Sequence, residues 1–183
     1  MVLALLALGP AARAEVTLDA GGERYAVEGI DGPAALYSLT GAPLASSPTW
    51  TATGENYDDV LGWSDGGTCI ASAGDVNGDG YADLVVGAPY HDADGVNKGK
   101  VYVYHGSPSG PSAMPGFTAT GHTDWDQLGH GVAGVGEVNG DGSADILFGA
   151  PGVDASGNAR GQAYLYLGGS VESIYLPIII KGP

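Results

Sequence analysis

The chain is poor in basic residues and has a single cysteine. Only six lysines and arginines accompany 21 aspartates and glutamates in 183 residues, which gives a formal net charge of −15. Because so acidic a surface repels phosphate backbones and anionic lipid, we predict no nucleic-acid partner. Cys69 has no second cysteine with which to form an intrachain disulfide or to bind zinc. A divalent cation is a more natural partner for this many carboxylates.

Long apolar runs and sustained helical periodicity are also missing. The apolar runs at residues 2–14 and 174–180 are too short to span a bilayer, so we predict no transmembrane segment. The first run ends in Ala-Arg-Ala and resembles a secretory signal, although a positive n-region is missing. The alternative is a short buried segment. The signal-peptide interpretation predicts a secreted or cell-surface protein, and the second run is a strand candidate.

Glycine, proline and an internal repeat are abundant instead. The 33 glycines and 11 prolines indicate many turns between short elements. Nine residues recur 62 positions later, namely Asn77, Asp79, Asp83, Gly87, Pro89, Gly99, Tyr102, Tyr104 and Gly106. Upstream the offset is 67, because the first copy carries five extra residues after Gly62. A third, partial copy at residues 37–54 precedes both.

Each repeat reads as four short strands. The apolar runs at residues 82–88 and 144–150 are continuous, which suggests burial on both faces. The segments KVYVYH and QAYLYL alternate, so their tyrosines share one face. We interpret these tyrosines as an aromatic ladder that packs against the next blade, with a binding platform as the alternative. The fold predicted is all-β, with tandem four-stranded antiparallel propeller blades, about two full and one partial.

An acidic loop precedes the apolar run of each repeat. With Asp75 as position 1, side-chain oxygens fall at positions 1, 3, 5 and 9, and position 7 can offer its carbonyl. Such hard oxygen ligands suit calcium, whereas zinc would require nitrogen or sulfur. The alternative is a plain Asn-Gly or Asp-Gly turn without metal. A plain turn does not require three acids, which repel one another without a cation. An EF-hand is excluded, because position 12 is apolar in both copies.

The order of these motifs resembles the FG-GAP repeat. Leu-Gly, the acidic loop, Val-Gly-Ala-Pro and Gly-x-Val-Tyr-Val-Tyr follow one another over residues 51–169, as in the blades of integrin α-subunit propellers and of many secreted bacterial proteins. The resemblance implies that the acidic loop joins the first two strands of a blade and binds calcium. The implied ligands are Asp75, Asn77, Asp79, the Tyr81 carbonyl and Asp83 in the first site, and Glu137, Asn139, Asp141, the Ser143 carbonyl and Asp145 in the second.

The chain departs from the family pattern in three respects. Leu61 and Leu128 replace the phenylalanine of the FG motif, a mild change in packing. Glu137 stands where aspartate is usual, and its extra methylene must fit a tight loop, so we predict that the second calcium site is weaker. About three units fit the chain, fewer than the usual 4–8 blades. The chain is then a fragment, a homo-oligomer or an open stack.

We divide the chain into a signal peptide (1–14), a degenerate partial blade (15–54), two FG-GAP repeats (55–121 and 122–169) and a C-terminal strand or tail (170–183). The predicted function is that of a secreted, non-catalytic, calcium-binding module for extracellular recognition or adhesion. Loops 90–98 and 152–160 are candidates for binding a protein or glycan, since Asp92, Asp94 and Asp154 can meet a basic partner; the alternative is that these acids are merely solvated.

Two other functional classes are alternatives. One is a structural spacer or a piece of a larger propeller. The other is an enzyme, or the non-catalytic part of one. Catalysis is not predicted, because the four histidines are scattered and lie in no obvious catalytic constellation: His91, His105, His122 and His130.

Overall fold

The computed structural model describes residues 16–20, 23–28, 34–38, 48–152, 160–169 and 178–179. The expected signal peptide at residues 1–14 lies outside these residues, and so do residues 153–159 of the second candidate binding loop. Every regular element in the described part is a β-strand, and the strands form three antiparallel four-stranded sheets. The described residues include no helix that could cross a membrane. The all-β prediction is thus confirmed.

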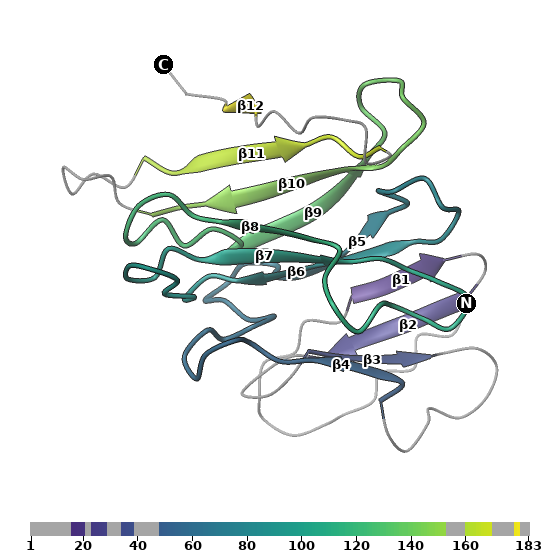
Figure 1. Cartoon of the computed structure of the whole chain (residues 1–183), viewed down its shortest axis with the longest axis horizontal. Coiled ribbons are helices and arrows are strands. Elements are labelled where there is room, and N and C mark those ends of the chain that lie inside the picture. The colour runs from purple at the N-terminus through teal and green to yellow at the C-terminus, as the bar shows by residue number, and fades with distance from the viewer. Residues whose placement is uncertain are drawn as a thin grey trace.

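The sheets follow one another along the chain, and within each sheet the strands are ordered as in the sequence (Figure 1). The first sheet contains β1 (Val16–Ala20), β2 (Glu23–Glu28), β3 (Ala34–Ser38) and β4 (Trp50–Ala52). The second contains β5 (Ile70–Gly74), β6 (Asp83–Ala88), β7 (Lys100–Tyr104) and β8 (Phe117–Thr120). The third contains β9 (Gly131–Gly136), β10 (Asp145–Ala150), β11 (Gln162–Tyr166) and β12 (Ile178–Ile179).

The first and third sheets differ in detail from the expected blades. The segment interpreted as a partial blade contains four paired strands, so the first sheet is complete in strand number. The third sheet takes its last strand, β12, from the segment interpreted as a C-terminal strand or tail. The sequence repeat ends before this strand, which is why repetition alone did not assign it to the sheet.

The second sheet lies between the other two and is apolar on both faces. All six residues of β6 are buried, as its continuous apolar run predicted. Leu84 and Val86 belong to a first core that also includes Ala52 of the first sheet. Val85 belongs to a second core together with Ile146 and Phe148 of the third sheet. Each core is therefore the contact between two consecutive sheets, as in neighbouring propeller blades.

The tyrosines of β7 and β11 pack against the preceding sheet. The ring of Tyr104 meets Trp50 of the first sheet edge-on, with centroids 4.8 Å apart. Tyr166 contacts Phe117 of the second sheet at 5.3 Å. The tyrosines do pack against a neighbouring blade, as predicted. The prediction that this is the next blade is wrong, because they pack against the preceding one. Strand alternation fixes which residues share a face and does not say which neighbour that face meets.

The Leu-Gly and Gly-Ala-Pro motifs of each repeat meet in space. The N–H of Gly62 donates to the carbonyl of Gly87 at 2.7 Å, and the N–H of Gly129 donates to that of Gly149 at 3.0 Å. A Cβ on Gly87 would approach the Gly129 carbonyl oxygen within 2.0 Å, so glycine is required there for the second and third sheets to come together. The leucines that replace the phenylalanine of the FG motif are both buried, Leu61 in the first core and Leu128 in the second.

Candidate metal centres

Two acidic loops join the first two strands of the second and third sheets. The first runs from β5 to β6, and the second runs from β9 to β10. Gly78 and Gly80 have φ values of 75° and 90°, and Gly140 and Gly142 have 83° and 90°. These left-handed conformations favour glycine and let each loop curl back on itself. A register shift precedes each loop, at Gly74 and at Gly136, where the strand pairing ends.

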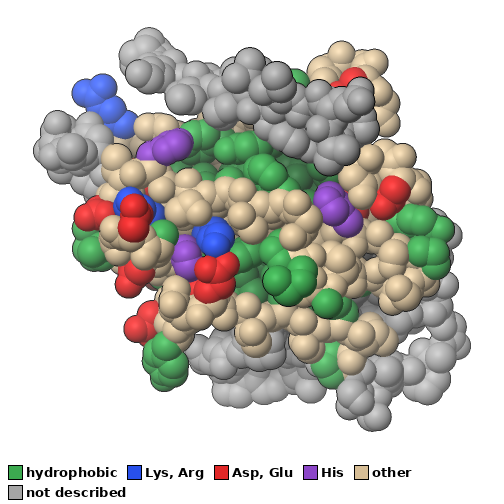
Figure 2. All heavy atoms as spheres, in the orientation of Figure 1, with side chains coloured by type: hydrophobic (Ala, Val, Ile, Leu, Met, Phe, Trp, Pro, Cys, Tyr) green, Lys and Arg blue, Asp and Glu red, His purple; other side chains and the backbone are tan. Residues whose placement is uncertain are grey.

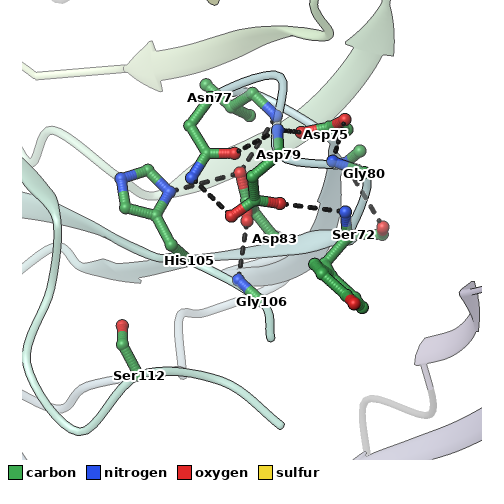
Figure 3. A network of polar contacts seen from close by, with 12 residues as sticks. Ser72, Asp75, Asn77, Asp79, Gly80, Asp83, His105, Gly106 and Ser112 are labelled. Carbon is green, nitrogen blue, oxygen red and sulfur yellow. Dashed lines mark hydrogen bonds and ion pairs between the residues drawn. The ribbon is translucent and has the colours of Figure 1, made fainter. Parts of the chain in front are cut away.

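The first loop turns its side-chain oxygens toward its own backbone (Figure 3). The N–H of Asp79 donates to Asp75 Oδ1 at 3.0 Å and to Asn77 Oδ1 at 3.1 Å. The N–H of Gly80 donates to Asp75 Oδ2 at 2.8 Å. The amide of Asn77 donates to Asp79 Oδ2 at 2.9 Å. Positions 1, 3 and 5 of the expected ligand set are thus brought together at one turn of the chain.

The second loop repeats this arrangement with an altered first position. Glu137 accepts hydrogen bonds from the N–H groups of Asn139, Gly140 and Gly142. The N–H of Gly142 and Gly140 hold the pKa of Glu137 below its usual range. Position 5 of this loop is Asp141, and its N–H donates only to Asn139 Oδ1, at 3.3 Å. Glu137 therefore does not bind the position-5 N–H, whereas Asp75 does in the first loop. The longer side chain is accommodated. It keeps the amide of position 6, which is Gly80 in the first loop and Gly142 in the second, and binds the amides of positions 3 and 4 in place of that of position 5.

Position 9 stands apart from the other ligands. Asp83 and Asp145 are both buried and accept hydrogen bonds on both carboxylate oxygens. Asp83 bonds the N–H of Val76 at 2.9 Å and that of Gly106 at 2.7 Å. In the third sheet Asp145 bonds the equivalent N–H groups, those of Val138 and Gly168, at 2.7 and 2.8 Å. Burial raises the pKa of Asp83 even though these donors act in the opposite direction.

Sequence reasoning missed His105 beside the first loop. Its Nδ1 lies 3.3 Å from Asp83 Oδ2 (Figure 3). The antiparallel register pairs Leu84 with Tyr104, so residue 105 falls opposite Asp83 at the end of the strands. Alternation alone leaves this register open to shifts of two residues, so the sequence held no signal that places His105 beside Asp83. The counterpart of His105 in the third sheet is Leu167, so this neighbour is specific to the first loop.

A second pair of repeated aspartates, also missed, organises the loops that enter β5 and β9. Asp59 Oδ2 accepts from the N–H of Asn56 at 2.7 Å, and Asp126, 67 residues later, accepts from that of Thr123 at 2.8 Å. Asp59 is almost fully buried with His91, whose Nδ1 lies 2.9 Å from Asp59 Oδ1. Burial acts to raise the pKa of Asp59, but its bonds to Asn56 and His91 hold it below its usual value. The shared G-x₄-D-x-L-G spacing of residues 54–62 and 121–129 was the available signal.

The donor set of the acidic loops suits a hard cation, although the described residues contain no group of three acids, histidines or cysteines gathered around one point. In the acidic loops, the carboxylates and the asparagine side-chain oxygens accept backbone N–H groups instead, and the asparagine side-chain nitrogens donate to Asp79 and Asp141. A carboxylate oxygen that accepts one N–H retains a further lone pair, so these contacts do not use up its capacity to bind a metal. All the donors are oxygens, which fits calcium in chemistry and is a poor match to zinc.

The comparisons with known proteins agree with the motif order. A family model described as "FG-GAP repeat" matches residues 70–104 and 129–166. Integrin alpha pat-2 of Caenorhabditis briggsae is 44% identical over 97 residues, covering 48% of this chain and 7% of the integrin. Integrin alpha-5 of Xenopus laevis is 30% identical over 139 residues, covering 73% of this chain and 12% of the integrin. Integrin alpha-PS2 of Drosophila melanogaster is 55% identical over 49 residues, 27% of this chain and 3% of the integrin.

The two matched segments are therefore FG-GAP repeats, and the sheets that contain them are blades of the β-propeller type. The chain that carries them is similar to integrin α subunits, whose length it spans only in small part. The first match covers β5 to β7, and the second covers β9 to β11.

We predict that Asp145 contributes more to stability than the exposed acids of the same loop. Asp145→Ala removes the acceptor of the buried Gly168 N–H, which should lower the free energy of unfolding by about 1–3 kcal/mol. Urea denaturation in the presence of chelator measures the loss without a contribution from metal. The matched control is Asp141→Ala, which changes an exposed acid in the same loop and should cost less than about 0.5 kcal/mol. Equal losses of unfolding free energy in Asp145→Ala and Asp141→Ala would contradict the larger structural role of Asp145.

Proposed function

We propose that the chain is an extracellular, non-catalytic recognition or adhesion module whose blades are held by calcium. The observation that carries the proposal is the pair of acidic loops, which recur in register and present oxygen donors at the same turn of two FG-GAP repeats. The first site would use Asp75, Asn77, Asp79, Asp83 and the carbonyl of Tyr81. The second would use Glu137, Asn139, Asp141, Asp145 and the carbonyl of Ser143.

Charge supports calcium as the resident cation. The formal net charge of −15 leaves the acids of each loop with few positive side chains nearby to offset their repulsion. Two Ca²⁺ ions carry four positive charges and would reduce the formal charge from −15 to −11. Outside cells, calcium is abundant enough to fill weak sites, with Kd on the order of 10⁻⁴–10⁻³ M. A secreted or cell-surface location would therefore match the chemistry of the loops.

The loops at the opposite end of the sheets support recognition. The N–H of Trp125 donates to the carbonyl of Val96 at 2.7 Å, and the N–H of Val96 donates to Asp124 Oδ1 at 3.1 Å. Trp125 and Val96 remain 50% and 43% exposed, and Trp125 adopts a left-handed φ of 67°. Acidic side chains gather around this end together with basic ones, at the left of Figure 2, and Asp94 and Glu55 are paired with Lys98 and Lys100. An ordered apolar pair among acids suits a protein or glycan ligand that combines apolar and basic groups.

Calcium removal should destabilise the whole chain. A site filled at a hundredfold excess over its Kd adds roughly 2.7 kcal/mol to the free energy of unfolding, so Tm should rise with millimolar calcium and fall with chelator. Differential scanning calorimetry measures the shift, and magnesium at the same ionic strength is the control. An unchanged Tm would overturn the calcium proposal.

The two sites should differ in affinity. Asp79→Ala leaves only the second site, and Asp141→Ala leaves only the first, because each removes the position-5 ligand of one loop. Since Glu137 binds the amides of positions 3 and 4 in place of that of position 5, we expect weaker calcium binding by Asp79→Ala than by Asp141→Ala. Calcium titrations followed by calorimetry compare the two variants. Tighter binding by Asp79→Ala would refute the ranking.

The recognition surface can be tested separately from calcium. Cells should attach to surfaces coated with the chain, and Trp125→Ala should reduce attachment while Tm in calcium changes little, because the side chain is half exposed. Met114→Ala, which removes an exposed apolar side chain between β7 and β8, is the matched control. If Trp125→Ala attaches cells as well as the wild type does, the recognition site lies elsewhere on the chain. If the wild-type chain attaches no cells, a structural spacer becomes the better account of its function.

A further inference from the structure

The first acidic loop is bonded directly to the third sheet. The N–H of Ala144 donates to the carbonyl of Asp75 at 2.8 Å, and the N–H of Gly169 donates to the carbonyl of Val76 at 2.7 Å. Ala144 directly precedes β10, and Gly169 lies beyond the end of β11, so both donors belong to the blade that follows. A Cβ on Gly74 would approach that of Ala144 within 2.6 Å, so the two segments pack closely. The first candidate metal centre is therefore part of the contact between two blades.

The bond from Ala144 to Asp75 joins two peptide groups that each belong to a candidate site. The peptide between residues 75 and 76 donates its N–H to the Asp83 carboxylate at 2.9 Å. Its carbonyl accepts from the N–H of Ala144. That N–H belongs to the peptide between residues 143 and 144, whose own carbonyl, that of Ser143, is an expected ligand of the second site. Two planar peptide groups thus link position 9 of the first site to position 7 of the second.

A second connection runs between the two buried aspartates. Val76 donates its N–H to Asp83, and its carbonyl accepts from Gly169. The neighbouring N–H, that of Gly168, donates to Asp145 at 2.8 Å. A side chain has no room at Gly168, because a Cβ there would lie 2.7 Å from the Val76 carbonyl oxygen. The position-9 carboxylates of both sites therefore act on adjoining stretches of backbone.

The third sheet shields these inter-loop bonds, which are the bonds from Ala144 to Asp75 and from Gly169 to Val76. Val76 is only 6% exposed, whereas Val138, its counterpart in the second loop, is 52% exposed. Gly169 is buried as well. Hydrogen bonds in such surroundings are electrostatically stronger than in water. A change in the order of one loop is therefore felt by the other.

We propose that cation binding at the two acidic loops is positively coupled, so that filling either site raises the affinity of the other. The proposal rests on the calcium sites of the proposed function and adds a link between them. A cation that orders the first loop also fixes the Ala144 N–H and, through the same peptide, the Ser143 carbonyl. The second cation then binds a carbonyl that is already ordered. Linkage requires the same factor in the reverse direction.

The magnitude of the coupling is set by two opposing effects. Ordering across the inter-loop bonds favours filling both sites, whereas repulsion between the two cations opposes it. Repulsion between exposed charges is screened at physiological salt, where the Debye length is about 8 Å. We therefore expect the ordering effect to dominate and to give a coupling factor of about fivefold, at the low end of typical couplings between sites.

Amide exchange measured by NMR tests the link in a chain with one working site. In Asp141→Ala, calcium fills the first site alone and should slow exchange at Ala144 and Gly169, in the other blade, by about fivefold. The measurement is made where these amides exchange by local opening. The matched control is the N–H of Val132, which joins the same two sheets by donating to the Thr68 carbonyl at 2.7 Å. Equal slowing at Val132 means general stabilisation and would contradict the link.

Calcium titration calorimetry at physiological salt measures the coupling factor. The product of the two binding constants of the wild type should exceed the product of the single-site constants of Asp79→Ala and Asp141→Ala by about fivefold. Replacing the Ala144 amide by an ester removes one inter-loop donor and no side chain. The factor should then fall toward one, when all three backgrounds carry the ester. The same ester at Val132 should leave the factor unchanged. Circular dichroism confirms that each variant is folded.

The outcomes separate the coupling from the calcium sites themselves. A wild-type chain that binds no calcium overturns both proposals. Two filled sites whose constants multiply to no more than the product of the single-site constants overturn the coupling and leave the calcium sites in place. A factor that survives the ester at Ala144, together with unchanged exchange at Ala144 and Gly169, overturns the inter-loop bonds as its cause.

Discussion

The buried aspartate at the end of each acidic loop is the interaction on which the rest of the blade depends. Asp83 ties the N–H of Val76, inside the loop, to that of Gly106, beyond the third strand of the sheet, and Asp145 does the same in the next blade. A single carboxylate thus fixes the loop, the start of the second strand and the exit of the third. The cost of burying it is offset by hydrogen bonds to both oxygens. The other acids of the loop, Asp75 and Asp79 in the first site, are then available to bind a cation on a loop that Asp83 holds in place.

Much of the fold could be predicted because the blades repeat. The continuous apolar run of β6 indicated burial on both faces, and alternation in β7 separated its tyrosines from Val101 and Val103. The sense of packing could not be predicted, because a tyrosine face is compatible with either neighbouring sheet. A strand was expected within residues 174–180, but its place in the third sheet could not be predicted, since Ile178 and Ile179 have no counterpart at the repeat offset. Local pattern determines strands and faces, whereas tertiary packing determines their partners.

The candidate site was predictable in composition and only partly in geometry. Spacing placed Asp75, Asn77 and Asp79 at one turn, and their shared hydrogen bonds bear out that proximity. Spacing could not reveal that Asp83 is buried and already bonded to two backbone donors, because those donors come from different parts of the chain. His105 and the Asp59–His91 pair were missed for the same reason: each contact joins residues more than 20 positions apart.

The same device serves both ends of the blades, and this explains how the loops can vary. Asp59 and Asp126 accept backbone N–H groups in the loops that enter β5 and β9, while Asp83 and Asp145 do so in the loops that leave these strands. Because these aspartates fix the loops before and after β5 and β9, the other side chains of the loops are not needed to hold the strands in register. The first repeat can therefore carry five extra residues, and the second can replace an aspartate by Glu137, without altering the strand pairing of either blade. These differences leave the strand pairing unchanged, although the inserted segment is only partly exposed: Ser64 and Cys69 are buried and donate to the His130 carbonyl next to β9. The insertion therefore adds a contact between the second and third sheets, whereas Glu137 changes only an exposed loop.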